Sequence, residues 1–202
     1  YKTRNGTKMI ARSGTTDAGE IVIIYANMEY PKEHFPQNGS PIILDIGANI
    51  GAFSIYIFKE LESKNPNIYA IEPSRKNLDY LKKNIELNRF GSIKCFNIAI
   101  FNRDGAGYID TGCNYDAFSV LDKENEGKDY EKINLSTLES FCASNHIGKI
   151  DLMKMDVEGG EYRIFEKSID FIKNNVKSIF IELHNLDDSN NIKMFKEYIA
   201  GH

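Results

Sequence analysis

Carboxylates and a histidine follow two apolar, strand-like segments, and these groups could move a proton. Asp156 and Glu158 come directly after the apolar run 150–155. Glu182 and His184 end a second run. Histidine titrates near neutral pH, and carboxylates act as general bases when their surroundings raise the pKa. Successive side chains of a strand alternate, so we expect each pair to share one side. Asp156, Glu158 and His184 are the candidate catalytic residues, and the pattern does not choose among them.

A further carboxylate, Glu161, stands where the next helix is expected to begin. A negatively charged side chain stabilises a helix N-terminus, and this effect alone can explain a glutamate at position 161. Three carboxylates within six residues are nevertheless costly unless they face solvent, a cation or a ligand. Oxygen ligands suit Mg²⁺ or Ca²⁺, so metal binding is the alternative interpretation, although the spacing matches no calcium loop. We assign no metal ligand.

A glycine-bearing turn, residues 45–51, follows the apolar run 42–46 and precedes a helix-like segment. This order is typical of a nucleotide-type cofactor site, because Gly47 lets the backbone turn sharply and Gly51 would let the helix start close to a ligand. Asn49 stands where a dinucleotide fingerprint has its second glycine, the one that admits a pyrophosphate. The turn therefore favours a cofactor without a pyrophosphate.

The ends of the next two apolar runs offer partners for a ribose and a base. Glu72 lies 21 positions after Gly51, near the place where an acidic residue receives ribose hydroxyls. A carboxylate can accept hydrogen bonds from both hydroxyls of a cis-diol. Alternatively, Glu72 stabilises the helix that Ser74 caps. Together with the glycine turn, ribose binding is the favoured interpretation. Ala99 follows the third run and fits either an adenine wall or the core.

The alternation of strand-like and helical segments predicts a doubly wound, mostly parallel α/β sheet of the Rossmann-like kind. The expected strands are 42–46, 68–71, 93–98, 150–155 and 177–184. The expected helices are 51–63, one capped by Ser74, one opened by a capping box of Ser136 and Glu139, 160–173 and 190–200. Residues 102–132 are rich in Gly, Asp and Asn and are expected to form a hairpin and a loop.

Residues 1–40 are predicted to form an N-terminal appendage to a cofactor-binding domain of residues 41–202. Asn5 and Gly6 indicate a hairpin turn. Asp17 and Glu20 have the spacing of a capping box, which predicts that a helix begins there.

The overall composition narrows the class of protein. The 202 residues carry a formal net charge of −4, which favours neither a nucleic-acid partner nor an anionic membrane surface. No apolar run has the length of a membrane span. The three cysteines are widely spaced and match no zinc pattern, which is typical of reduced thiols in a cytoplasmic protein. The sequence indicates no particular oligomeric state.

Taken together, these motifs resemble the FkbM-like family of S-adenosylmethionine-dependent methyltransferases. The resemblance runs from about residue 10 to about residue 185 and rests on the segments 44–51, 71–73, 150–161 and 182–184. The glycine turn alone is common to many methyltransferases. Its combination with the Asp-Val-Glu-Gly run at 156–159 is much more specific.

The resemblance implies S-adenosyl-L-methionine as the cofactor. The glycine turn would line its methionine part, with Asp45 beneath, and Glu72 would bind the ribose. Ala99 would lie near the adenine, and Asp156 and Glu158 near the methyl group. The implied cofactor-binding set is Asp45, Gly47, Ala48, Asn49, Gly51, Glu72, Pro73, Ala99 and Asp156.

The resemblance also implies O-methylation of a small-molecule or carbohydrate hydroxyl, because the family typically methylates hydroxyls of sugars, polyketides and other small metabolites. The alternatives are a cofactor-binding domain without catalysis and an NAD-dependent oxidoreductase, against which Asn49 argues. About 18 residues follow His184, too few for the helix and two strands that normally close such a sheet. We therefore expect those strands to be missing.

Overall fold

The computed structural model describes residues 1–26, 30–111, 120–121, 129–184 and 195. The helix expected at 190–200 and the thiol of Cys113 lie outside these residues. Within them, no helix combines the length and the apolar character that crossing a bilayer requires.

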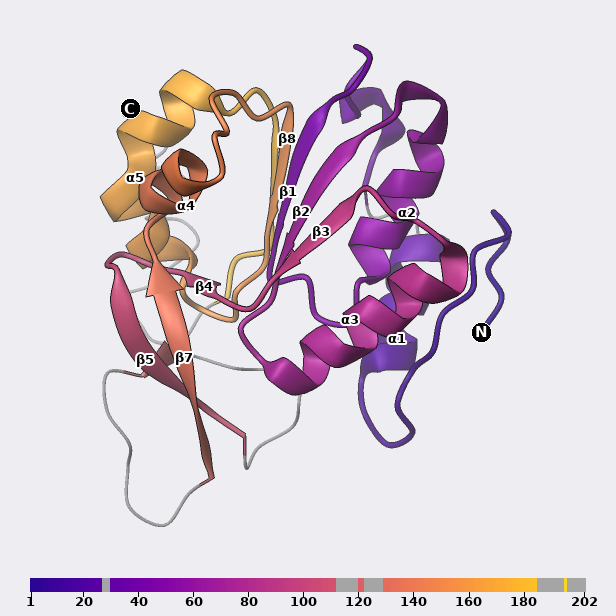
Figure 1. The fold of residues 1–202 in the computed structure, drawn as a ribbon, viewed down its shortest axis with the longest axis horizontal. Coiled ribbons are helices and arrows are strands. Elements are labelled where there is room, and N and C mark those ends of the chain that lie inside the picture. Colours follow the sequence, from indigo (N-terminus) through magenta and orange to yellow (C-terminus); the bar gives the residue numbers. More distant parts are fainter. Residues whose placement is uncertain (27–29, 112–119, 122–128, 185–194, 196–202) are drawn as a thin grey trace.

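A five-stranded parallel sheet forms the centre of the molecule, as predicted (Figure 1). Its strands lie in the order β3-β2-β1-β8-β9. Their bounds are β1 Ile42–Ile46, β2 Asn67–Ile71, β3 Ile93–Phe96, β8 Leu152–Met155 and β9 Ile179–Ile181. The chain moves outward from β1 to β3 and then returns to the other side of β1. The strand order therefore reverses between β1 and β8, which is where such sheets bind ligands.

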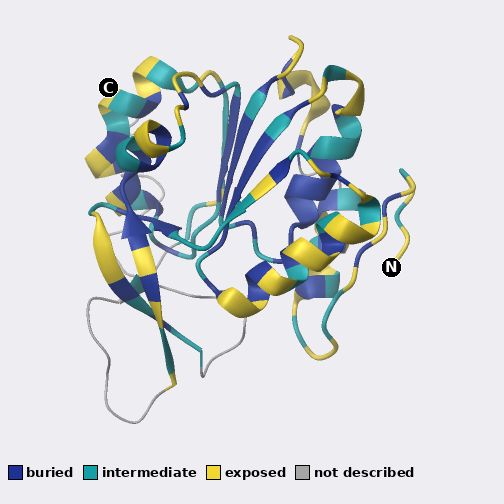
Figure 2. Ribbon diagram, in the orientation of Figure 1, coloured by how far each residue is buried: buried dark blue, intermediate teal, exposed yellow. Residues whose placement is uncertain are grey.

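Helices cover both faces of this sheet (Figure 1). One layer holds α1 Asp17–Ala26, α2 Ala52–Glu60 and α3 Arg75–Asn88, and the other holds α4 Leu138–Ser144 and α5 Glu161–Asn175. Short 3-10 helices span Lys32–His34 and Glu62–Lys64. Alternate side chains of one strand enter the two layers: Ile43 packs in the cluster of α1–α3, and Leu44 in that of α4 and α5. The central strands β1, β2 and β8 are accordingly buried on both faces, whereas the edge strands β3 and β9 are partly exposed (Figure 2).

A second sheet occupies part of the region expected to hold a hairpin and a loop. Its strands are β4 Ala99–Ile100, β5 Gly105–Asp110, β6 Val120–Leu121 and β7 Tyr130–Ser136, in the order β4-β7-β5-β6. The expected hairpin exists as the antiparallel β5–β7 pair, but β4 and β6 extend it. The sequence of β5 does not show a regular alternation of apolar and polar residues, because it contains Gly105, Gly107 and Asp110. Its residue Ile109 is nevertheless fully buried.

Both predicted capping boxes are wrong in detail. Thr137, not Ser136, caps α4, and its Oγ1 accepts from the Ser140 amide at 3.2 Å. Ser136 is instead the last residue of β7. Glu139 instead accepts a hydrogen bond from Ser168 on α5 at 2.8 Å. Ser74 does cap α3, as expected, accepting from the Asn77 amide at 3.4 Å.

Asp17 anchors the N-terminal segment rather than capping α1. Its carboxylate accepts from the Arg12 amide at 2.8 Å and from the Arg12 guanidinium at 2.6 and 2.9 Å. Burial raises the pKa of the Asp17 carboxyl, but the hydrogen bonds from Arg12 lower it by more, so the pKa lies below its usual value. The predicted hairpin at Asn5 is present as an antiparallel bridge between Lys2 and Lys8. Met9, Ile21 and Ile24 are buried in the cluster that α2 and α3 share, so this segment packs directly on the core.

Candidate active site

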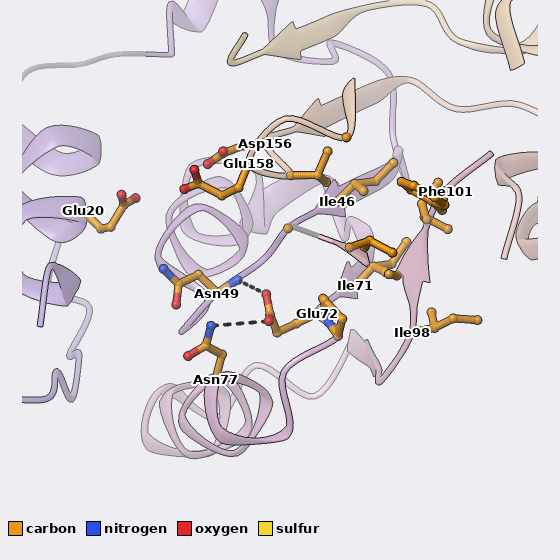
Figure 3. Close-up of a pocket in the computed structure, with 17 residues that line it drawn as sticks. Glu20, Ile46, Asn49, Ile71, Glu72, Asn77, Ile98, Phe101, Asp156 and Glu158 are labelled. Atoms are coloured by element: carbon orange, nitrogen blue, oxygen red, sulfur yellow. Dashed lines mark hydrogen bonds between the residues drawn. The ribbon is translucent and has the colours of Figure 1, made fainter. Parts of the chain in front are cut away.

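A pocket lies at the carboxyl ends of β1, β2 and β8, beside the switch point (Figure 3). The turn after β1 supplies Gly47 and Asn49, and the segment after β2 supplies Glu72 and Pro73. The apolar wall consists of Ile46, Ile71, Ile98, Ala99, Ile100, Phe101 and Val120. The β8–α5 loop supplies Asp156, Val157, Glu158 and Gly160, and Glu20 and Asn77 complete the lining. The strand ends that the sequence indicated therefore meet at one place.

Gly47 allows the β1 turn and the end of β8 to touch. Its φ is +79°, and a Cβ added there would lie 1.7 Å from the carbonyl oxygen of Asp156. Lys154 joins the same two segments, donating to the Gly47 carbonyl at 3.0 Å and to Asp156 Oδ2 at 3.1 Å. Burial lowers the pKa of Lys154, but Asp156 and Asp45 outweigh it and hold the pKa above its usual value.

Asn49 is the residue that departs from the dinucleotide fingerprint, and it lines the pocket. Its φ is +48°, a left-handed conformation that asparagine tolerates better than most residues. Its amide donates to Glu72 Oε2 at 2.8 Å. Its side-chain Oδ1 is buried and has no hydrogen-bond partner among the described residues. A buried, unpaired carbonyl of this kind is expected to meet a ligand or water.

Three residues of the implied cofactor set, Asp45, Ala48 and Gly51, do not belong to the pocket lining. Asp45 is fully buried and accepts from Ser54 Oγ of α2 at 2.5 Å. Ala48 is buried in the core. Gly51 has a φ of +88°, and a Cβ there would lie 2.3 Å from Cδ1 of Leu81 on α3. Gly51 is therefore required by helix packing, a reason other than the close ligand approach that the sequence indicated.

Glu72 is a buried carboxylate held by the backbone on both sides. Oε2 accepts from Asn49, and Oε1 accepts from the Ser74 amide at 2.9 Å and from Asn77 Nδ2 at 3.4 Å (Figure 3). Burial raises the pKa of Glu72 to about 7, although these hydrogen bonds lower it. Arg12 donates to Asn77 Oδ1 at 2.7 Å, so a chain of hydrogen bonds links the N-terminal segment to this carboxylate.

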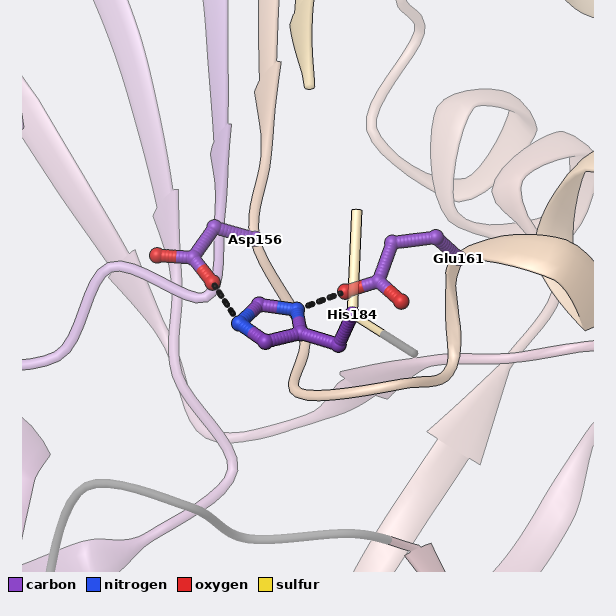
Figure 4. Close-up of side chains that lie close together, drawn as sticks. All are labelled: Asp156, Glu161 and His184. Atoms are coloured by element: carbon purple, nitrogen blue, oxygen red, sulfur yellow. Dashed lines mark hydrogen bonds and ion pairs between the residues drawn. The ribbon is translucent and has the colours of Figure 1, made fainter. Parts of the chain in front are cut away.

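The three predicted catalytic residues meet around the His184 ring, and Figure 4 shows this ring with Asp156 and Glu161. Nδ1 lies 3.0 Å from Glu161 Oε1, and Nε2 lies 3.4 Å from Glu158 Oε2 and 3.9 Å from Asp156 Oδ1. The hydrogen bond to Glu161 raises the pKa of His184 to about 9, against the effect of burial. His184 is therefore an imidazolium at neutral pH, with both nitrogens acting as donors. Unlike Asp156 and Glu158, it does not line the pocket.

The predicted alternation at these strand ends does not hold. β8 ends at Met155, and Glu158 follows in a left-handed conformation with a φ of +54°. It nevertheless lines the same pocket as Asp156, because the loop turns back. β9 ends at Ile181, and beyond it Glu182 is exposed while His184 turns inward. Loop geometry, not the strand period, places these groups.

Asp156, Glu161 and His184 also offer ligand atoms within 4.8 Å of one another, a separation compatible with a metal ion. In the observed arrangement the imidazole lies between the two carboxylates, with one nitrogen toward each (Figure 4). Both ring nitrogens thus face carboxylates already, one through a hydrogen bond to Glu161 and one through an ion pair with Asp156.

The sequence interpretation overlooked several residues of this site. Glu161 was read as a helix-terminal charge, and Asn77, Glu20 and Lys154 were not singled out. One signal was available for Lys154, which interrupts the otherwise apolar strand β8 and pairs in register with Asp45 of β1. A lysine in a buried strand is rare unless a charged partner faces it.

The fold and the site now permit comparison with known proteins. The sequence profile of the methyltransferase FkbM domain matches residues 45–200, most of the chain. The chain belongs to the FkbM methyltransferase domain family. The family resemblance inferred from the motifs is therefore confirmed, and the pocket lies within the matched part of this FkbM domain, apart from Glu20.

Individual relatives agree with this assignment. Methyltransferase sdnD of Sordaria araneosa is 26% identical over 173 residues, which are 71% of this chain and 65% of that protein. Methyltransferase FkbM from Methylobacillus flagellatus KT superposes with a TM-score of 0.56 at 17% identity, covering 90% of this chain and 41% of the other. A SAM-dependent methyltransferase from Agrobacterium tumefaciens gives 0.53 at 9% identity, covering 96% and 53%. The FkbM domain shares the fold of both, and it spans about two thirds of the curated relative.

Proposed function

We propose that this FkbM domain binds S-adenosylmethionine and promotes transfer of its methyl group to a hydroxyl oxygen of a small molecule or sugar. The observation that carries the proposal is Glu72. A buried carboxylate, fixed by the amides of Asn49 and Ser74, faces a pocket at the switch point of the sheet. Oε2 accepts from the Asn49 amide alone among these bonds and so keeps a lone pair for a ribose hydroxyl, whereas Oε1 already accepts from Ser74 and Asn77.

The remaining lining fits the other parts of this cofactor. The apolar wall around Ala99 and Phe101 suits an adenine ring. The carboxylates of Asp156 and Glu158 lie at the β8 side of the same pocket, where they suit a sulfonium and an ammonium group. The unpaired Oδ1 of Asn49 supplies an acceptor for the cofactor. This donor and acceptor set supports the assignments made for Gly47, Asn49, Glu72, Pro73 and Ala99.

When bound, S-adenosylmethionine supplies an electrophilic methyl group on a positively charged sulfur. The chain must then align an acceptor hydroxyl with that methyl and remove the hydroxyl proton. Alignment provides much of the rate in such reactions, and a base is needed because a hydroxyl of high pKa is a weak nucleophile. The proton would pass to a side chain as the carbon–oxygen bond forms and the sulfur–methyl bond breaks, with S-adenosylhomocysteine as the leaving group.

Glu158 is the best-placed base among the three candidates. His184 is protonated and so has no lone pair to offer. Asp156 is engaged by the buried Lys154 ammonium at 3.1 Å. Glu158 lines the pocket, and burial raises its pKa to about 7, with His184 opposing the shift. A carboxylate with that pKa is ionised for much of the time at neutral pH and can hold a proton when it receives one.

Titration calorimetry with S-adenosylhomocysteine and with NAD tests the cofactor assignment. We expect heat from S-adenosylhomocysteine and none from NAD. Binding of NAD without a response to S-adenosylhomocysteine would support the oxidoreductase alternative instead. Methyl transfer is then sought across a panel of sugars and phenols with labelled cofactor. Cofactor binding with no transfer to any acceptor would support the alternative of a binding domain without catalysis.

Replacing Glu72 with alanine should weaken S-adenosylhomocysteine binding by about 1–3 kcal/mol, because the ribose loses its buried acceptor and the amides of Asn49 and Ser74 lose theirs. Calorimetry on Glu72→Ala measures this directly. Glu86→Ala is the matched control, since Glu86 is an exposed residue of α3. Equal affinities of Glu72→Ala and the control protein would show that Glu72 does not bind the ribose.

A further inference from the structure

Glu161 makes more contacts than a helix-terminal charge requires. It is fully buried at the first position of α5. Its Oε1 accepts from the Val157 amide at 3.1 Å and from the Gly159 amide at 3.2 Å. The same oxygen lies 3.0 Å from His184 Nδ1. One carboxylate oxygen therefore joins the β8–α5 loop to the residue that follows β9.

The loop that Glu161 holds has an unfavourable backbone. Glu158 has a φ of +54° and Gly159 a φ of +97°, so two successive residues are left-handed. For glutamate this conformation costs roughly 1–2 kcal/mol. The amides on either side of Glu158 are the two that donate to Glu161. These bonds stabilise the turn that directs the Glu158 side chain into the pocket.

The same carboxylate fixes the ring of His184. With Nδ1 bonded to Glu161, the opposite nitrogen is directed at Asp156 (Figure 4) and also lies near Glu158. Burying the Glu161 carboxylate would be costly without a cationic partner, and the imidazolium supplies one. The groups facing His184 are Asp156, Glu158 and Glu161 from the β8–α5 segment and Glu182 beyond β9, with Lys154 of β8 bonded to Asp156.

We propose that Glu161 is a positioning residue for methyl transfer: it holds the β8–α5 loop and the His184 imidazolium as one unit that presents the Glu158 carboxylate to the acceptor hydroxyl. The inference deepens the proposed function and rests on it. Glu161 acts through His184 and the loop amides and touches neither acceptor nor cofactor.

The key variant is Glu161→Gln, which keeps an oxygen acceptor for the two loop amides and removes the negative charge. The pKa of His184 should then fall from about 9 to about 7 or below, because its strongest partner loses its charge. Titration of His184 followed by NMR of the imidazole nitrogens measures this without any acceptor. Glu166→Gln, an exposed change on the same helix, is the control and should leave the titration unchanged.

Activity provides the second measurement. A neutral His184 no longer favours ionised Glu158, so the acidic limb of the kcat/KM profile should move to higher pH by roughly one unit. Affinity for S-adenosylhomocysteine should stay within about threefold of wild type. His184→Gln should shift the limb in the same direction, and adding Glu161→Gln to it should produce little further change. This second variant keeps the test usable if Glu161→Gln does not fold.

Several outcomes overturn the inference while leaving the proposed function intact. One is a lowered melting temperature of Glu161→Gln with unchanged His184 titration and pH profile, which would make Glu161 merely structural. Another is additive effects in the double variant. A third is activity that EDTA abolishes and Mn²⁺ restores, since the three groups would then bind a metal. Failure of wild-type cofactor binding or methyl transfer would instead contradict the proposed function itself.

Discussion

Alanine at position 47 should abolish detectable cofactor binding. Position 47 has a φ of +79°, which costs a non-glycine residue roughly 1–2 kcal/mol. The added Cβ would also lie 1.7 Å from the Asp156 carbonyl oxygen. That atom belongs to the backbone at the end of β8, so no side-chain rotation relieves the clash. The β1 turn and the β8 end must separate, which breaks the Lys154 bridge and displaces Asn49 from Glu72.

Calorimetry should show at least about a 100-fold loss of S-adenosylhomocysteine affinity in Gly47→Ala, equivalent to about 2.7 kcal/mol. The melting temperature should also fall. Gly51→Ala is an informative comparison, because its Cβ would meet only the side chain of Leu81, at 2.3 Å. It should destabilise the protein while a folded fraction still binds. Gly91→Ala, at an open position, should change neither quantity. Wild-type affinity in Gly47→Ala would contradict the placement of the cofactor.

Much of this fold was predictable because its central strands β1, β2 and β8 are buried on both faces. Such strands appear in sequence as short continuous apolar runs, and β1, β2 and β8 were all recognised this way. The turn after β1 could also be predicted, since glycine and asparagine are the residues that readily adopt the left-handed conformations that this strand–helix turn needs. Because parallel strands end at one edge, the residues following each strand could be expected to meet there.

Short sequence motifs such as the capping box were less informative, because a side chain that fits the motif can form its hydrogen bonds with a different residue. Asp17 and Glu139 each fit a capping box, yet one pairs with Arg12 and the other accepts from Ser168. The second sheet was missed in part, because its strands are short and rich in glycine or polar residues. Gly51 was recognised as a required glycine, but the reason for it, Leu81, comes from a different helix.

The choice of base was beyond the sequence for a related reason. Whether a carboxylate or an imidazole can accept a proton depends on its burial and on the charges around it. For His184 the decisive neighbour is Glu161, which is 23 positions away and looked like an ordinary helix-terminal charge. The contact between Glu161 and His184 is seen only in the three-dimensional arrangement, and it is the reason for proposing Glu158 as the group that takes the proton.

Replacing Glu158 with glutamine should therefore lower kcat for methyl transfer by about 10²–10⁴-fold, the usual contribution of a positioned general base. Cofactor affinity should change by less than about threefold, because the amide keeps the shape and the polarity of the side chain. Glu182→Gln is the matched control: its carboxylate also lies 3.9 Å from His184, but the residue is exposed and outside the pocket lining. It should retain most of the activity.

The pH dependence separates a base from a residue that merely shapes the pocket. In the wild-type protein kcat/KM should rise with pH and level off above about 7, where Glu158 is ionised. This limb should disappear in Glu158→Gln. The folded-state pKa of Glu158, about 7, exceeds the ordinary glutamate value of 4.5, so this group favours the folded state at low pH, and that contribution is lost as pH rises towards 7.

Glu158→Gln should accordingly have a higher melting temperature than the wild type at pH 8, and this difference should shrink towards pH 4. Thermal unfolding at both values, with Glu182→Gln alongside, tests this directly. A variant with lower activity and higher stability is the expected result if the Glu158 carboxylate is needed for activity but destabilises the folded protein. A variant that is slower, no more stable at pH 8 and still dependent on the same acidic limb would place the base elsewhere, with Asp156 the next candidate.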